Sequence, residues 1–123
     1  MADPALATWL SAQLDMNQES TRTRLYWAQQ TILTLRDPKL LGKYIPGWHD
    51  WPQVEAMCQQ RLAELDAARQ IISLHAPHSS GACPTCWRIT ARSATREDYP
   101  CPTLCRLASP YAARPGYREE WRP

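Results

Sequence analysis

Cysteine and histidine residues, whose side chains bind zinc in proteins, are concentrated in one stretch of the chain. Residues 75–105, HAPHSSGACPTCWRITARSATREDYPCPTLC, hold four of the five cysteines and two of the three histidines. Cys83-Pro84-Thr85-Cys86 is a C-x2-C turn, and this spacing lets one turn supply two thiolates to the same ion. The sequence therefore predicts a knuckle held together by structural zinc.

The remaining ligands must come from outside this turn, because zinc takes four. Cys101 follows the turn after fourteen residues and precedes Pro102, which is typical of the first turn of a helix. At the start of a short third helix, the helix dipole favours the thiolate form of Cys101. Three residues stay open as the fourth ligand: His75, which closes the second predicted helix, His78, or Cys105, which would complete an all-cysteine site.

Other chemistries are less favoured by the surroundings of these residues. Free thiols and an iron–sulfur cluster remain alternatives, since spacing alone does not distinguish zinc from such a cluster. A thiol redox pair of Cys83 and Cys86 usually accompanies a βαβ pattern, which is not evident here. A zinc deaminase needs H-x-E before its cysteine pair, whereas Ala76 and Pro77 follow His75. With no H-E-x-x-H, phosphate-loop or G-x-S-x-G motif, we expect a non-enzymatic protein.

Arginines recur every four residues between the second and third of these cysteines, at Arg88, Arg92 and Arg96. On a helix they would lie along one face and, with Arg106, could contact phosphate groups of nucleic acid or an acidic partner. An exposed loop or a solvated helix face is the favoured interpretation of this segment.

Length and charge limit the classes of function. The 123 residues fit one domain with a modest core. The net charge is +2; residues 1–75 carry seven Lys and Arg against eight acidic residues, and residues 76–123 carry seven Arg against four. This mild bias does not mark a strong polyanion binder. No signal peptide or membrane-spanning run is evident, so we expect a cytoplasmic protein without a membrane partner, in a compartment where disulfides are rare.

The first part of the chain, residues 1–36, has the apolar periodicity of one long amphipathic helix. Asp3-Pro4 is typical of a helix start, and Pro38 disfavours helical geometry just before it. Leucines spaced by four residues predict the buried face: Leu6, Leu10 and Leu14.

A second helix is expected over residues 53–75, after a connector of residues 37–52 that is rich in Pro, Gly and aromatic residues. Asp50 and Gln53 form a capping-box-like pair at its start. Its buried face is expected to contain Val54, Cys58, Leu62, Leu65 and Ile72, with Met57 as a further candidate. The aromatic residues of the connector, Tyr44, Trp48 and Trp51, are expected to fold back over the helices, because large aromatic surfaces are seldom left in water.

The C-terminal tail is too aromatic for a disordered end. We expect Tyr111, Tyr117 and Trp121 to dock across the two helices. The predicted fold is therefore mainly α: two long antiparallel helices, then residues 76–123 with a zinc knuckle, a short third helix and an ordered aromatic tail.

The segment from ARQIISLH at the end of the second predicted helix, through C-x2-C, to PCPTLCRLASPYAARPGYREEWRP resembles a family of small uncharacterised proteins of actinobacteria and their phages. The likeness covers about residues 68–123 and is strongest at PCPTL, PYA and PGYREEW. It implies His75, Cys83, Cys86 and Cys101 as the recurring set. It also implies Arg in most relatives at the position of Cys105, which makes Cys105 the less favoured ligand.

These observations favour a zinc-stabilised interaction module, such as a phage or accessory regulator that binds a host protein. Trp and Tyr, which are abundant here, are favoured at protein interfaces. A nucleic-acid binder using Arg88, Arg92, Arg96 and Arg106 is the alternative, and a thiol redox protein using Cys83 and Cys86 is a second. The residues leave the partner and the oligomeric state open.

Overall fold

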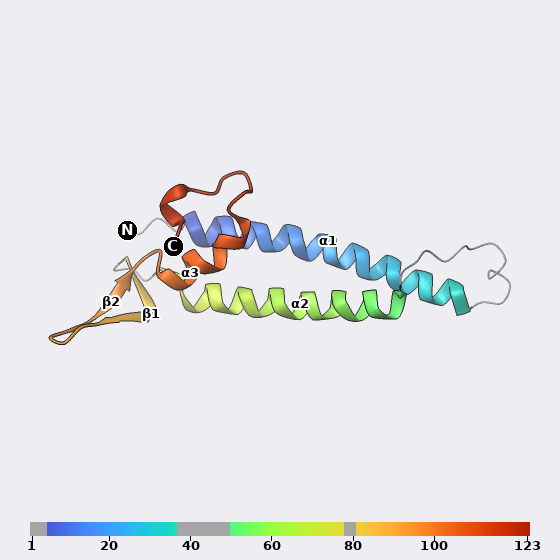
Figure 1. Cartoon of the computed structure of the whole chain (residues 1–123), viewed down its shortest axis with the longest axis horizontal. Helices are drawn as coiled ribbons and strands as arrows, with labels where there is room; N and C mark the ends of the chain where they lie inside the picture. Colours follow the sequence, from blue (N-terminus) through green and yellow to red (C-terminus); the bar gives the residue numbers. More distant parts are fainter. Residues whose placement is uncertain (1–4, 37–49, 78–80) are drawn as a thin grey trace. The chain divides into compact units, whose positions relative to one another are not determined.

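A computed structural model describes residues 5–36, 50–77 and 81–123. The chain forms α1 (Ala5–Arg36), α2 (Trp51–Leu74), the strands β1 (Ala82–Ile89) and β2 (Ala94–Asp98), and α3 (Pro102–Ala108), followed by two 3-10 turns at Ser109–Tyr111 and Glu119–Trp121 (Figure 1). The predicted mainly helical fold, with two long helices and a short third one, is confirmed. None of the helices in the described ranges is long and apolar enough to cross a membrane.

Three predictions fall on parts of the chain outside the described residues. They are the helix start at Asp3-Pro4, the aromatic residues Tyr44 and Trp48 of the connector, and His78 as an alternative ligand.

The helix ends follow local sequence signals. α1 ends at Arg36, as the prediction from Pro38 requires. The Oδ1 atom of Asp50 accepts a hydrogen bond of 3.1 Å from the backbone N–H of Gln53, so Asp50 is the N-cap of α2. α2 therefore begins at Trp51, two residues earlier than predicted, and ends at Leu74. The N–H of His75 still donates to the carbonyl oxygen of Ile71 (3.1 Å), which places His75 at the end of the last turn.

The chain divides into two compact units. The cysteine unit consists of Met1–Asp15 and Ala67–Pro123, and the helix-pair unit consists of Met16–Asp66. Within the helix-pair unit, α1 and α2 run antiparallel and side by side (Figure 1). That the chain folds as a single domain stays a prediction.

The core of the cysteine unit is built on one face of α1. Leu6 and Leu10 are completely buried, and Leu14 nearly so, because residues spaced by four lie on one face of a helix. Burying each such side chain contributes roughly 1.5–3 kcal/mol. Other buried side chains of this unit are Ile72, Leu104, Ala108 and Trp121.

The C-terminal tail docks on Trp9 of α1. Its indole N–H donates to the carbonyl oxygen of Pro115 (3.0 Å), and its ring centroid lies 5.7 Å from that of Tyr117 and 5.5 Å from that of Trp121. The approach is close at Gly116, which has a φ of +87° and where a Cβ atom would lie 2.7 Å from the indole nitrogen of Trp9. Tyr117 and Trp121 thus dock on α1 as predicted, whereas the ring of Tyr111 stacks with the guanidinium of Arg114 within the tail.

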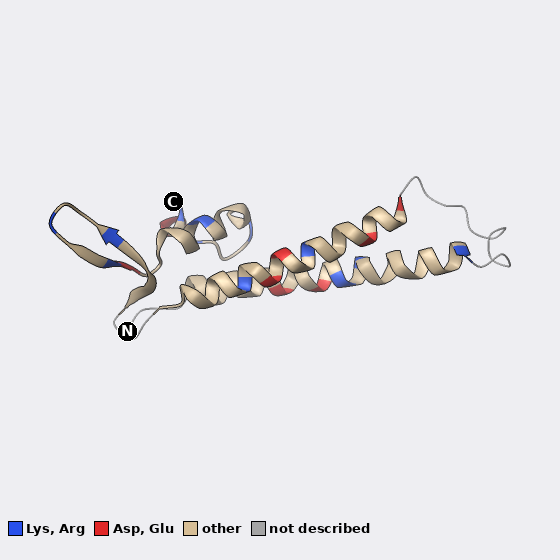
Figure 2. Cartoon of the chain, turned by 90° about the horizontal axis from the view of Figure 1, so that it is seen from below, with Lys and Arg blue, Asp and Glu red and all other residues tan. Residues whose placement is uncertain are grey.

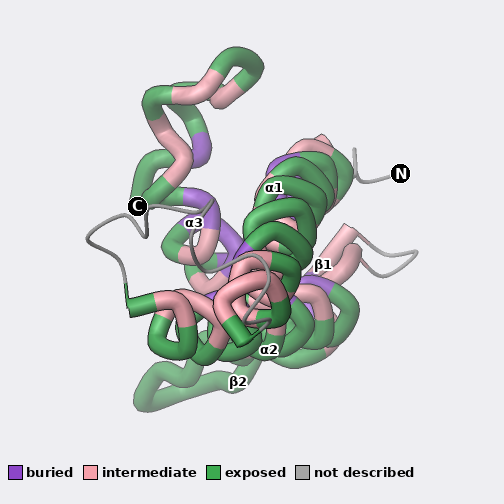
Figure 3. Tube along the Cα trace, turned by 90° about the vertical axis from the view of Figure 1, so that its right-hand side faces the viewer, coloured by how far each residue is buried: buried purple, intermediate pink, exposed green. Residues whose placement is uncertain are grey.

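Residues 82–98 form an antiparallel hairpin, so the interpretation of this segment as an exposed loop or helix is wrong. Trp87 pairs with Arg96, Arg88 with Thr95, and Ile89 with Ala94. Alternating aromatic and β-branched residues favour a strand here, and the backbone N–H of Thr90 donates to the carbonyl oxygen of Ser93 (2.8 Å) to close the turn. Figure 3 shows that β2 is mostly exposed along its length.

The C-x2-C turn interrupts this hairpin. Ala82 pairs with Asp98 and Trp87 with Arg96, so β1 contains three more residues than β2 between the two pairs. The extra residues leave the ladder as a bulge. The turn predicted from the spacing of Cys83 and Cys86 is therefore a bulge within a strand, anchored on both sides by strand pairing.

Candidate metal centre

Three elements of the cysteine unit bring four potential ligands together. His75 follows the last residue of α2, Cys83 and Cys86 lie in the bulged part of β1, and Cys101 is the N-cap residue of α3. One ligand atom from each of the four lies within 4.8 Å of the others. Pro102 at the first position of α3 explains why a helix begins directly after Cys101.

The distances suit a tetrahedral metal ion. The Nδ1 atom of His75 lies 3.3 Å from the Sγ atom of Cys83, 3.3 Å from that of Cys86 and 3.5 Å from that of Cys101. A zinc ion with bonds of about 2.3 Å to sulfur and about 2.0–2.1 Å to nitrogen separates its N and S ligands by about 3.5 Å. None of the five cysteines forms a disulfide. The donor set therefore fits zinc and forms a candidate metal-binding site; the identity of the metal stays a prediction.

The candidate site is shielded from water. Cys83 and Cys101 have no exposed surface, His75 is buried, and Cys86 is half-buried. Four protein donors also complete a tetrahedral shell, which is the arrangement of structural zinc sites, whereas catalytic sites keep one position open. The arrangement can hold an ion and join three elements.

Burial and hydrogen bonding act in opposite directions on the thiols. Burial disfavours the Cys83 thiolate, but hydrogen bonds from the backbone N–H groups of Thr85 and Cys86 outweigh it and lower the pKa of Cys83. Burial, followed by a smaller contribution from the neighbouring Cys83 sulfur, raises the pKa of Cys101 to about 12. Desolvation of Cys101 thus outweighs the helix-dipole effect that favours its thiolate form. A bound cation would stabilise all three thiolates together.

Two contacts around the ligands were not predicted from the sequence. The backbone N–H of Cys86 lies 3.3 Å from the Sγ atom of Cys83, within hydrogen-bond distance. The hydroxyl oxygen of Thr103 lies 3.5 Å from the Sγ atom of Cys86. Such contacts orient ligands and tune their basicity. Thr103 lies two residues after Cys101, in the first turn of α3. This position in the sequence could have indicated that its hydroxyl group contacts a ligand.

The alternative cysteine ligand is not part of the group. The Sγ atom of Cys105 contacts the carbonyl oxygen of Pro100 (3.9 Å), and burial raises the pKa of this thiol. Among the described residues, the group that could hold a metal contains His75, Cys83, Cys86 and Cys101 without Cys105.

The four arginines do not form one stripe. Arg88 pairs with Glu97 (3.0 Å), while the guanidinium of Arg96 stacks on the ring of Trp87 (4.8 Å) and donates to the carbonyl oxygen of Pro84. The register places Arg88 and Arg96 on opposite faces of the hairpin, because Arg96 pairs with Trp87, the residue before Arg88. Arg92 lies in the turn, and Arg106 lies on α3.

The hairpin instead displays an apolar face that the sequence did not reveal. Trp87 is 52% exposed and Ile89 is 79% exposed, and as residues two apart in a strand they share one face with their partners Arg96 and Ala94. Trp87 and Ile89 lie on either side of Arg88 in the sequence, and this alternation could have indicated a strand with an apolar face.

Comparisons with known proteins add a family but no function. A family model described as a family of unknown function (DUF6221) matches residues 3–123. No curated protein matches the chain, and neither does any solved structure.

Proposed function

Because the chain belongs to DUF6221, a family of unknown function, we propose its function from the candidate metal centre: a non-enzymatic interaction module stabilised by zinc. The observation that carries the proposal is the convergence of one imidazole nitrogen and three thiol sulfurs within 4.8 Å at the ends of three elements. Bound zinc would supply a cross-link between α2, the hairpin and α3. It would leave no coordination position for a substrate.

The hairpin supports a protein as the partner. Trp87 and Ile89 form an exposed apolar face on strands whose base carries the candidate metal site, and aromatic side chains such as that of Trp87 are enriched at protein interfaces. Glu97 neutralises Arg88, and Arg96 covers one side of the Trp87 ring, so neither arginine is available to a phosphate without losing a contact. The role as a phage or accessory regulator of a host protein rests on the resemblance of the C-terminal signature.

Elemental analysis of the reduced, purified chain tests the metal. We expect one zinc per chain, no iron, and a large drop in the melting temperature after chelation, because structural zinc contributes directly to folding. A protein without metal that melts as cooperatively as the untreated sample contradicts the proposal.

Two further measurements test the alternative functions. Fluorescence anisotropy of labelled DNA and RNA at low and high salt should show no salt-dependent binding; strong binding that weakens steeply with salt favours the nucleic-acid alternative. Thiol alkylation should be slow for the zinc-loaded protein and fast after chelation. Rapid labelling of Cys83 or Cys86 with zinc bound would favour the thiol redox alternative.

A further inference from the structure

The helix-pair unit buries little of its own apolar surface. Among its described residues, the buried apolar side chains are Ala28, Cys58 and Leu65. Five large apolar side chains of the same unit are exposed: Met16, Tyr26, Trp27, Leu33 and Met57. Two helices alone bury too little apolar surface for a stable core, and stable helical bundles add further helices.

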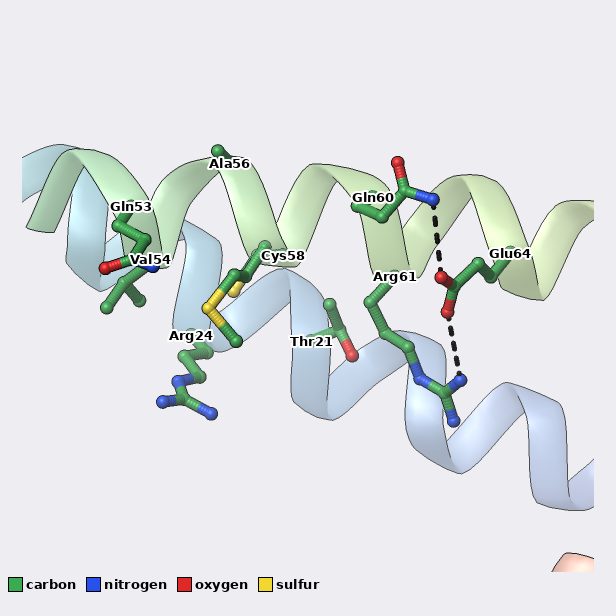
Figure 4. A pocket seen from close by; sticks show the side chains of 10 residues that line it. Thr21, Arg24, Gln53, Val54, Ala56, Cys58, Gln60, Arg61 and Glu64 are labelled. Carbon is green, nitrogen blue, oxygen red and sulfur yellow. Dashed lines mark hydrogen bonds and ion pairs between the residues drawn. The ribbon is translucent and has the colours of Figure 1, made fainter.

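A groove of about 630 Å³ runs between the two helices of this unit (Figure 4). Val54, Met57 and Cys58 of α2 line its apolar part, and Thr21 and Arg24 of α1 line the opposite side. Met57 is 61% exposed. On α2 the lining residues extend from Gln53 to Glu64, a length of about 17 Å along a helix axis. A groove of this length suits a helix better than a compact small molecule.

The charges of the unit are nearly balanced. Its described residues contain four arginines and five acidic residues, and Figure 2 shows both signs along the two helices (Arg22, Arg24, Arg36, Arg61; Glu19, Asp50, Glu55, Glu64, Asp66). Net charge therefore neither opposes the association of two copies nor selects a partner of opposite charge.

The charges at the groove are also self-complementary. Arg24 lies beside Cys58, and Glu64 lies further along α2, six residues or about 9 Å beyond Cys58 (Figure 4). Arg24 has no ion pair among the described residues, whereas Glu64 pairs with Arg61 (3.4 Å), which also lines the groove. A second copy turned end over end would place Arg24 of each copy next to Glu64 of the other, twice in one interface.

We propose that the helix-pair unit is a dimerisation surface, on which a second copy of this chain packs groove to groove to form a four-helix bundle. The 16 residues of α2 in this unit span about 24 Å, and two adjacent helices are about 20 Å wide. A face of this size is of the order needed for a standard interface, which buries about 800 Å² per partner. The proposal does not depend on the metal centre.

Sedimentation velocity of the full chain, reduced and loaded with zinc, tests the association. We expect a species of twice the 14.1 kDa chain mass at micromolar concentrations. Met57→Glu should raise the dissociation constant at least about tenfold, because it places a charge in the apolar part of each copy's interface. A chain that stays monomeric up to about 0.5 mM, or a dimer unaffected by Met57→Glu, overturns the proposal.

A charge exchange tests the twofold arrangement. Arg24→Glu and Glu64→Arg alone should each weaken the dimer by about tenfold, and the double variant should regain most of the affinity because the opposite charges again meet across the interface. Arg22→Glu is the matched control: it makes the same charge change two residues away, does not line the groove, and should leave the dimer intact. A double variant as weak as the single variants, or a control as weak as Arg24→Glu, contradicts groove-to-groove packing.

Discussion

His75 shows how one residue links the helical and cysteine-rich parts of the cysteine unit. Its backbone completes the last turn of α2, and its Nδ1 atom lies within 3.5 Å of three sulfur atoms. The same position in the chain therefore ends a helix and supplies the only nitrogen ligand of the candidate group in the described part of the chain. This double role fixes the end of α2 relative to the hairpin and α3 once an ion is bound.

Cys101 and Cys105 form a matched pair for testing the ligand assignment. Both are buried cysteines associated with α3, but the Cys101 thiol belongs to the group and the Cys105 thiol does not. Cys101→Ser should lower zinc affinity by more than about 100-fold, because losing a ligand costs more than losing a surrounding contact. Cys105→Ser should keep one zinc per chain. Competition with a chromogenic chelator measures both; equal losses would refute the assignment.

Zinc binding should release protons. Burial, followed by the nearby Cys83 sulfur, raises the pKa of Cys101 to about 12, so the free site holds this proton at pH 7, whereas the bound form is a thiolate. The metal-bound state thus carries fewer protons, and affinity should rise with pH, by about tenfold per unit for each proton released.

Calorimetric titration in buffers of different ionisation enthalpy measures the number of protons released at pH 7, and chelator competition at pH 6, 7 and 8 measures the slope. Binding without proton release, or with an affinity that falls as pH rises, contradicts the assignment of thiolate ligands.

Among the elements, the tail depends on one tight contact. Gly116 has a φ of +87°, and a Cβ atom there would meet the indole of Trp9. Gly116→Ala should therefore lower the free energy of unfolding by about 1–3 kcal/mol, since it combines backbone strain with a steric clash. Denaturant unfolding with zinc present measures this change.

Pro115→Ala is the control for this substitution. It changes the neighbouring exposed residue but keeps the carbonyl oxygen that accepts the Trp9 hydrogen bond. Its effect should be well below that of Gly116→Ala. Equal effects would mean that the tail is not held by this contact.

At the scale of the whole molecule, the two units should respond differently to loss of the metal. The candidate ligands all belong to the cysteine unit, whereas the helix-pair unit contains none of them. Chelation should therefore remove amide-exchange protection from β1, β2 and α3 while changing residues 16–36 and 50–66 much less, because opening occurs in cooperative units. Hydrogen exchange with and without chelator measures this pattern. Loss of protection throughout both units at once would instead support one cooperative domain.

The hairpin is a feature that the sequence pattern did not predict. The four-residue recurrence of Arg88, Arg92 and Arg96 fits a helix, but strand pairing and the bulge around the C-x2-C turn decide the conformation of the segment. Pairing energy depends on which residues meet across two strands, and a local pattern does not contain that information.

The amino-acid sequence by itself determined the two long helices, the end of α1, the cap of α2, the start of α3 and the types of the four candidate ligands. Each follows from interactions between residues close in the chain, such as capping, proline geometry and helical periodicity. Only the tertiary structure decided that Cys105 lies outside the group, that the tail packs on Trp9, and that Trp87 and Ile89 share an exposed face. These features depend on contacts between residues distant in the chain, whose free energy exists only once the elements have packed.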